Sequence, residues 1–164
     1  MTMLQQGPYQ VQAVVENQPS HREGTADAAI LPGTGVVAYV GTDGEWNVRQ
    51  ATSNEDSYRV AIVPGGAKTG PTAGANDDSA ASLDSEFASG EHTYTLGFHS
   101  GDQARLRLSS NATADPTDTE LGWDTDGTVT DDDGAGNGPT TAVARGLERL
   151  TRTGADDFVR VEFL

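Results

Sequence analysis

The sequence has no cysteine, one lysine, few aromatic residues and no long apolar segment. The absence of cysteine excludes disulfides and thiolate chemistry. A membrane-spanning helix needs about 20 consecutive apolar residues, so the sequence predicts a protein without such helices. Residues 1–9 contain neither a basic region nor an apolar core. We therefore expect no signal peptide.

Charge is the strongest compositional feature. The chain carries 25 acidic and 10 basic residues, a formal net charge of −15, and every basic residue except Lys68 is arginine. Such a chain has no basic patch to neutralise phosphates, so we expect no binding to nucleic acid. Molar salt would screen the repulsion between carboxylates, and the scarcity of lysine favours a halophilic source. An ordinary acidic protein is the alternative.

The content of large aliphatic and aromatic residues is low. Phe, Leu, Ile and Val together make up 29 of the 164 residues. This proportion and the high charge are typical of disordered chains. Several segments nevertheless alternate apolar and polar residues, which favours a folded protein. Strong salt also strengthens apolar burial, so a core rich in Ala and Val is sufficient.

The apolar residues recur with a period of two, which is typical of half-buried β-strands. The predicted strands are residues 9–15, 36–40, 45–50, 58–63, 92–98, 104–108 and 159–163. Short strands separated by turn residues indicate a mainly β fold. We expect a single compact antiparallel β-barrel or sandwich with long Gly/Ala/Asp-rich loops and at most one short helix.

Two segments allow more specific predictions. Residues 99–103 have the composition of a hairpin connection, so 92–98 and 104–108 are expected to be antiparallel neighbours. Facing inward would be Tyr94, Leu96, Phe98, Leu106 and Leu108, and facing outward Arg105 and Arg107. Residues 140–152 have helical propensity, but Gly146 weakens a helix by roughly 1 kcal/mol. This segment is predicted as either a helix or a strand.

Low-complexity segments define the predicted domain organisation. Residues 65–90 and 131–138 are rich in small and acidic residues and cannot build a core. We predict an N-terminal arm and first strand over residues 1–29, then one β-domain over 30–164 with a long loop at 65–90. Long loops are unusual in compact domains, so a neighbouring subunit is expected to hold this one.

The sequence predicts no catalytic residue, no cofactor and no enzymatic activity. Its three histidines are His21, His92 and His99. The last two are separated by an odd number of positions, which places them on opposite faces of a straight strand. Neither a Gly-x-Ser-x-Gly elbow nor a phosphate-binding loop is present. With so many carboxylates, no acid–base pair stands out.

A weak candidate for a cation site lies near residue 127. Its potential ligands are Asp124, Asp126, Asp131 and Asp133, and carboxylates on a flexible loop are suitable for calcium. The EF-hand pattern fails because its twelfth position would be Asp133 in place of glutamate. The alternative is a solvated acidic loop that holds cations loosely.

Four parts of the sequence carry a resemblance to a known family. They are Ile-Leu-Pro-Gly-Thr-Gly-Val-Val at 30–37, Tyr-Arg-Val-Ala-Ile-Val-Pro at 58–64, Leu-Gly-Trp-Asp-Thr-Asp-Gly-Thr-Val at 121–129, and 141–148 followed by 158–161. In this order they resemble the strands and turns of the small head decoration, or cement, proteins of tailed viruses. The acidity implies a version from a haloarchaeal virus.

The resemblance implies a β-barrel that oligomerises, often as a trimer, and clamps the capsid lattice from outside. It makes 141–151 a strand and transfers no catalytic residue. The implied partner is the major capsid protein, and the implied location is the outer capsid surface after synthesis in the host cytoplasm. Alternatives are another virion part, such as a tail, spike or jelly-roll capsid subunit, and a cell-surface or carbohydrate-binding β-module.

Bridging between capsid subunits is the expected mode of action. Residues 1–7 and 65–90 lack core residues, and contacts across an interface would offset the entropy cost of ordering them. Arg22 and Arg49 are the predicted partners for carboxylates on an equally acidic capsid, because a guanidinium can bind a carboxylate with two hydrogen bonds.

Overall fold

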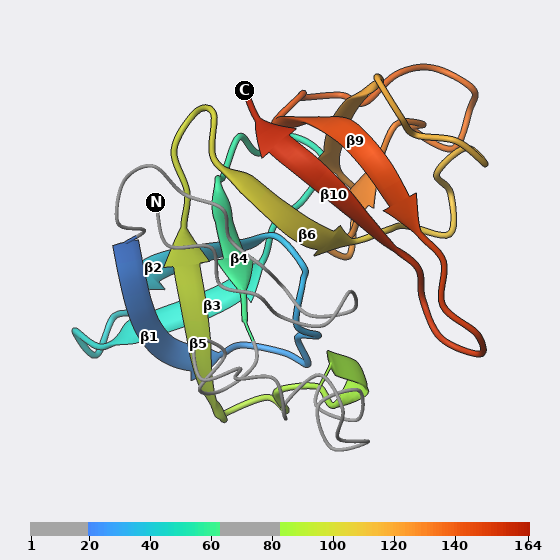
Figure 1. Ribbon diagram of the computed structural model, residues 1–164. Helices are drawn as coiled ribbons and strands as arrows, with labels where there is room; N and C mark the ends of the chain where they lie inside the picture. The colour runs from blue at the N-terminus through green and yellow to red at the C-terminus, as the bar shows by residue number, and fades with distance from the viewer. Residues whose placement is uncertain (1–19, 63–82) are drawn as a thin grey trace.

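The computed structural model describes residues 20–62 and 83–164, and these residues contain ten β-strands (Figure 1). They are β1 (Ser20–Ala26), β2 (Val36–Val40), β3 (Trp46–Gln50), β4 (Arg59–Ala61), β5 (His92–Gly97), β6 (Gln103–Arg107), β7 (Glu120–Trp123), β8 (Val129–Thr130), β9 (Ala144–Leu150) and β10 (Phe158–Phe163). The mainly β fold is as predicted. No helix in these residues is long and apolar enough to span a membrane.

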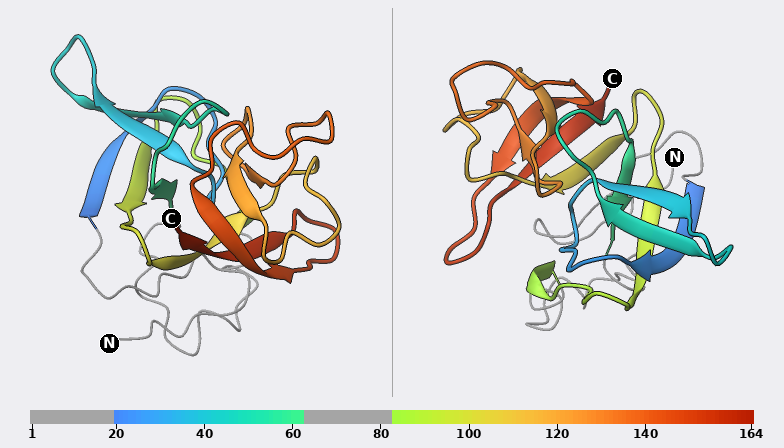
Figure 2. Two further views of the ribbon diagram at one scale, coloured as in Figure 1. Left: turned by 90° about the horizontal axis from the view of Figure 1, so that it is seen from above. Right: turned by 180° about the vertical axis from the view of Figure 1, so that it is seen from behind.

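The strands form two five-stranded sheets, which lie side by side in Figures 1 and 2. The first has the order β2-β3-β1-β5-β4 and the second β6-β10-β9-β7-β8. All strand pairs in these sheets are antiparallel except β1 with β3. The order of strands separates the chain roughly into an N-terminal and a C-terminal sheet.

Each sheet curls so that its own two outer strands approach each other at one position. A bridge between Gly35 and Val60 joins the chain beside β2 to β4, and one between Leu108 and Val129 joins the end of β6 to β8. Strongly twisted sheets curl in this way when their edges approach each other. The two outer edges of each sheet are thus joined by a single bridge.

Apolar side chains gather in two clusters. The larger is built mainly from the second sheet and includes Trp123, Phe158 and Phe163, whereas the smaller lies in the first sheet and includes Ile30 and Val48. In β10 the buried residues alternate with exposed ones towards its end, as expected for a strand with one face on the core. Burial of these side chains is the main force that holds the strands together.

The indole of Trp123 connects the second sheet to the first. It is 1% exposed, and its Nε1–H donates to the Ser57 carbonyl at 2.8 Å. A buried indole N–H normally needs such an acceptor. Gly35 leaves room for the ring, because a Cβ there would lie 2.5 Å from Trp123 atoms. The two sheets are therefore locked together by both packing and a hydrogen bond.

The predicted hairpin between 92–98 and 104–108 is wrong. Strand β5 pairs with β1 and β4, whereas β6 pairs with β10 in the other sheet. Both edges of β5 are occupied, so the turn after it carries the chain from one sheet to the other. The residues of the turn predict that the chain reverses direction, but they do not predict which strand edges are free to pair with β6.

The inward and outward assignments in this region are only partly correct. Phe98, Leu106 and Leu108 are buried as predicted, whereas Tyr94 and Leu96 are half-buried. In β5 it is Thr93 and Thr95 that are fully buried. Arg107 is also buried, whereas the sequence predicts that it faces solvent. The inward face predicted for β5 is therefore wrong, because its threonines, and not Tyr94 and Leu96, are the fully buried residues.

Residues 140–152 contain strand β9 and no helix, as the family resemblance implied. Its pairing with β10 shifts register between Arg160 and Val161, which is typical of a β-bulge. Gly146 lies at this point, and a Cβ there would be 2.0 Å from the Pro116 carbonyl oxygen. The glycine that weakened the helix prediction therefore permits a close backbone approach.

Strand β1 was not predicted, because its sequence does not alternate apolar and polar side chains. Its buried residues are only Gly24 and Ala26. The predicted strand at 9–15, the arm at 1–7 and most of the loop at 65–90 lie outside the described residues. At the end of that loop, Leu83 and Phe87 are buried.

Candidate functional site

The carboxylates proposed for a cation site take part in separate local hydrogen bonds. Asp124 accepts from the Ser109 hydroxyl at 2.7 Å and the Asn111 amide at 2.9 Å. Asp126 accepts from the Thr128 backbone N–H at 3.0 Å. These bonds are typical of turns stabilised by aspartate.

The other two carboxylates of that set act in the same way. Asp131 accepts from the Thr113 N–H at 2.8 Å, and Asp133 accepts from the Asn137 side chain at 3.0 Å. Within the described part of the chain, no three His, Cys, Asp or Glu side chains are grouped to hold a metal ion. The four aspartates are thus used to shape loops.

Each histidine has its own contacts in the fold, and His21 and His92 both lie near the ring of Tyr94. His92 Nε2 is 2.6 Å from a Glu23 carboxylate oxygen, and His99 Nδ1 is 3.6 Å from Asp102. The ring of His21 lies 6.3 Å from that of Tyr94. None of these contacts joins two histidines.

Most arginines are neutralised within the fold. Six of them form ion pairs with carboxylates among the described residues, namely Arg49, Arg107, Arg145, Arg149, Arg152 and Arg160. The prediction that Arg49 serves a partner's carboxylate is not supported by this geometry. Both of its terminal nitrogens bond to Glu55, because a turn at Thr52 brings that carboxylate back beside β3.

The guanidinium of Arg22 behaves differently. It lies over the ring of Trp46, 3.7 Å from the ring centroid, which is a close cation–π contact. No carboxylate in the described part of the chain lies within ion-pair distance of Arg22. Arg22, which was predicted together with Arg49 to bind a partner, therefore has no ion-pair partner within the described residues.

Arg59 is a second arginine without a carboxylate partner in the described part. Its guanidinium donates to the Ser20 carbonyl at 3.0 Å, the Ser20 hydroxyl at 2.9 Å and the Thr95 hydroxyl at 3.1 Å. Burial, and then the positive charge of nearby Arg22, lower the pKa of Arg59. The two guanidinium groups thus create a locally positive region on an acidic protein.

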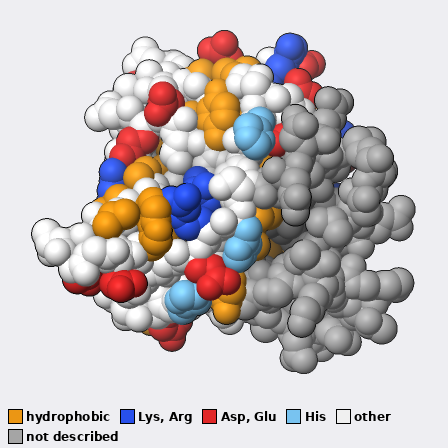
Figure 3. All heavy atoms as spheres, turned by 90° about the vertical axis from the view of Figure 1, so that its left-hand side faces the viewer, with side chains coloured by type: hydrophobic (Ala, Val, Ile, Leu, Met, Phe, Trp, Pro, Cys, Tyr) orange, Lys and Arg blue, Asp and Glu red, His pale blue; other side chains and the backbone are white. Residues whose placement is uncertain are grey.

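Exposed hydrophobic side chains lie beside these arginines. Val40 and Trp46 are paired across the β2–β3 hairpin, and they are 53% and 39% exposed. We call Arg22, Arg59, Val40 and Trp46 the arginine–tryptophan surface. Figure 3 shows basic side chains in the middle of this face, with hydrophobic ones next to them and acidic ones around them. Large exposed apolar groups of this kind often mark interaction sites.

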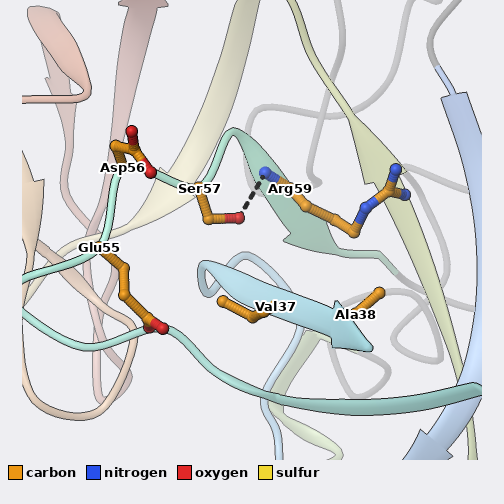
Figure 4. Close-up of a pocket in the computed structure, with 6 residues that line it drawn as sticks. All are labelled: Val37, Ala38, Glu55, Asp56, Ser57 and Arg59. Atoms are coloured by element: carbon orange, nitrogen blue, oxygen red, sulfur yellow. Dashed lines mark hydrogen bonds between the residues drawn. The ribbon is translucent and has the colours of Figure 1, made fainter. Parts of the chain in front are cut away.

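A pocket of about 340 Å³ adjoins this surface between β2 and β4. The Gly35–Val60 bridge joins the chain just before β2 to β4 near these residues. Its lining residues are Val37, Ala38, Glu55, Asp56, Ser57 and Arg59. In Figure 4 the stem of Arg59 borders the pocket, while its guanidinium points away from Glu55 and Asp56. The pocket therefore extends the surface with a mixed apolar and acidic wall.

A buried arginine lies on the second sheet. Arg107 is 1% exposed; it donates to the Pro32 carbonyl at 3.1 Å, to the Leu83 carbonyl, and to Asp156 at 2.9 Å. Asp84 lies 3.5 Å from the same guanidinium. Three segments that are distant in sequence therefore converge on one cation, in contrast to the predicted exposure of Arg107 to solvent.

Two neighbouring carboxylates are held in the charged state. Both oxygens of Asp84 bond to Arg152, and Asp157 accepts from the Arg149 guanidinium and the Arg152 N–H. Burial alone would raise the pKa of each carboxyl. The Arg152 side chain at Asp84, and the Arg152 N–H with Arg149 at Asp157, outweigh it and lower both pKa values.

These lowered pKa values predict acid sensitivity. The stabilisation is complete above the unfolded carboxyl pKa of about 4 and is lost as the pH falls through the lower folded values. In molar salt, where general repulsion is screened, we expect the melting temperature to fall between about pH 5 and pH 2. Calorimetry measures this. Asp157→Asn should weaken the acid dependence, and a melting temperature that rises on acidification would contradict the prediction.

Comparison with known proteins gives a fold relationship. No protein family and no curated protein matches the sequence. Solved structures with a similar fold include the head fiber gp8.5 N base in bacteriophage phi29, with a TM-score of 0.57 and 12% identity. The match covers 90% of this chain and 95% of that chain. The two proteins therefore have the same overall β architecture.

Proposed function

We propose that this protein is a structural part of a virus particle, which binds the outside of the capsid and stabilises the shell without turning over a substrate. The observation that carries the proposal is the fold shared with a phage head fiber base over almost the full length of both chains. A match of this extent reflects the whole domain and not a common hairpin. Fold likeness alone does not determine function, so charge and surface features add the further support.

The charge of the chain favours an outer position. A net charge of −15 would be repelled by packaged nucleic acid, but is well tolerated on a surface that faces brine. We infer a halophilic, archaeal virus as the source, because the acid excess and the single lysine suit molar salt. The major capsid protein is the proposed partner, and self-association would multiply the contacts of each chain with the shell.

Reconstitution of particles tests the proposal. Purified protein is added in molar salt to particles that lack it, and cryo-electron microscopy locates the added density. We expect density on the outer capsid face and a higher temperature of genome release. Density inside the shell or on the tail would contradict the decoration role. A fibre rising from the bound domain would instead favour a fibre base, the role named for the phi29 neighbour.

A further inference from the structure

We propose that the arginine–tryptophan surface binds an acidic segment of the shell protein, with carboxylates on Arg22 and Arg59 and an apolar side chain against Trp46. This inference rests on the proposed function, since it names the chemistry of the capsid partner. It assigns the docking face to the first sheet, on the side of β1 and of the β2–β3 hairpin. It also divides the arginines into those that hold the fold and those that serve a partner.

The first argument is the distribution of charge within the fold. Six arginines have carboxylate partners among the described residues, yet Arg22 and Arg59 have none there. The chain has 25 acidic residues, so internal partners are abundant. Two neighbouring guanidinium groups repel each other, and an added carboxylate would relieve this repulsion while gaining charge-assisted hydrogen bonds.

The second argument is geometric. The Arg22 guanidinium carbon lies over the Trp46 ring, 3.7 Å from its centroid, and this contact holds the guanidinium in place before any partner arrives. Arg59 is oriented by bonds to Ser20 and Thr95. Preorganised side chains lose little entropy on binding. Arginine and tryptophan are also the residue types most often found to dominate interface energetics.

The third argument concerns the type of occupant. A nucleic acid would bring many phosphates towards the acidic side chains near this face, such as Glu55 and Asp56, which line the adjoining pocket together with Arg59. A short peptide can place one or two carboxylates on the arginines and direct the rest of its length away. Val40 and Trp46 also leave apolar area that a peptide side chain can cover and a free anion cannot.

Charge-matched variants test the inference. Arg22→Gln and the double variant with Arg59→Gln remove the proposed contacts, whereas Arg145→Gln removes an exposed arginine from the second sheet. Among the described residues the Arg22 guanidinium forms a cation–π contact with Trp46 and no ion pair. A surface cation–π contact contributes only a small part of the stability of a fold, so this variant should melt close to the native protein. We expect Arg22→Gln to weaken co-sedimentation with particles by about tenfold or more. Arg145→Gln should bind as the native protein does.

A direct probe separates this inference from the proposed function. A hexaglutamate peptide is titrated into the isolated protein in molar salt and followed by tryptophan fluorescence, in which the exposed Trp46 should respond and the buried Trp123 should not. Inorganic phosphate is used in a parallel titration. Saturable binding of the peptide that Arg22→Gln abolishes would support the surface even if particles did not bind. Native-like particle binding by the double variant, or saturation by phosphate without peptide binding, would overturn the inference. So would a change of oligomeric state in Arg22→Gln, which would identify a second copy as the occupant.

Discussion

Transfer of this protein from molar salt to dilute buffer is expected to unfold it. The Debye length grows from about 3 Å at 1 M salt to about 10 Å at 0.1 M, so repulsion within a chain of net charge −15 is no longer screened. The core has little to set against it, since even Thr93 and Thr95 occupy fully buried positions. Apolar burial also weakens as salt is removed. Far-UV circular dichroism across a salt titration measures the transition.

A charge-reduced variant shows whether repulsion is the cause. Glu45, Glu86 and Glu120 are exposed, and no ion pair in the described residues uses them. Replacement of all three by glutamine should move the unfolding midpoint to lower salt. Cooperative melting of the native protein in dilute buffer, unchanged from molar salt, would remove the argument for a halophilic source.

Replacement of Arg107 by alanine should lower the free energy of unfolding by about 3–5 kcal/mol. The guanidinium is 1% exposed and joins the Pro32 and Leu83 carbonyls to Asp156. Its removal would leave the Pro32 and Leu83 carbonyls without this donor and create a cavity beside Phe158, whose ring lies 5.0 Å away. Asp156 is 57% exposed and can bind water instead. Denaturant unfolding in molar salt measures the loss.

The matched control is Arg145→Ala. Arg145 and its partner Asp118 are both largely exposed, with side chains 57% and 74% accessible. Exposed pairs contribute only about 0–1 kcal/mol, so this variant should be close to the native protein in stability. Equal losses from Arg107→Ala and Arg145→Ala would show that the buried guanidinium has no special structural role.

Part of the fold could be predicted from the sequence. Alternation is a local property of the chain, so β2, β3, β4, β6 and β10 were located from the sequence to within a few residues. The pairing of β5 was not predicted, because it depends on which edges β1 and β4 occupy. Strand β1 was missed since its inward positions are small, with Gly24 and Ala26 buried.

In the candidate site, too, the sequence predicts some features and the fold decides others. Arg22 and Arg49 were both selected from the sequence as partners for a capsid, and nothing in their neighbours separates them. The fold pairs Arg49 with Glu55 and stacks Arg22 on Trp46. Arg59 could not have been grouped with Arg22, because β5 brings β4 and β1 together across a long sequence separation.

The sequence by itself determined the acidity, the strand period and the mainly β class, since each depends on composition or on near neighbours along the chain. Only the tertiary structure decided which strands share a sheet, that Arg107 is buried, and which arginines are left without carboxylates in the described residues. The physical reason is that pairing, burial and charge neutralisation are contacts between distant segments. Arg107 itself is bonded to Pro32, far from it in sequence.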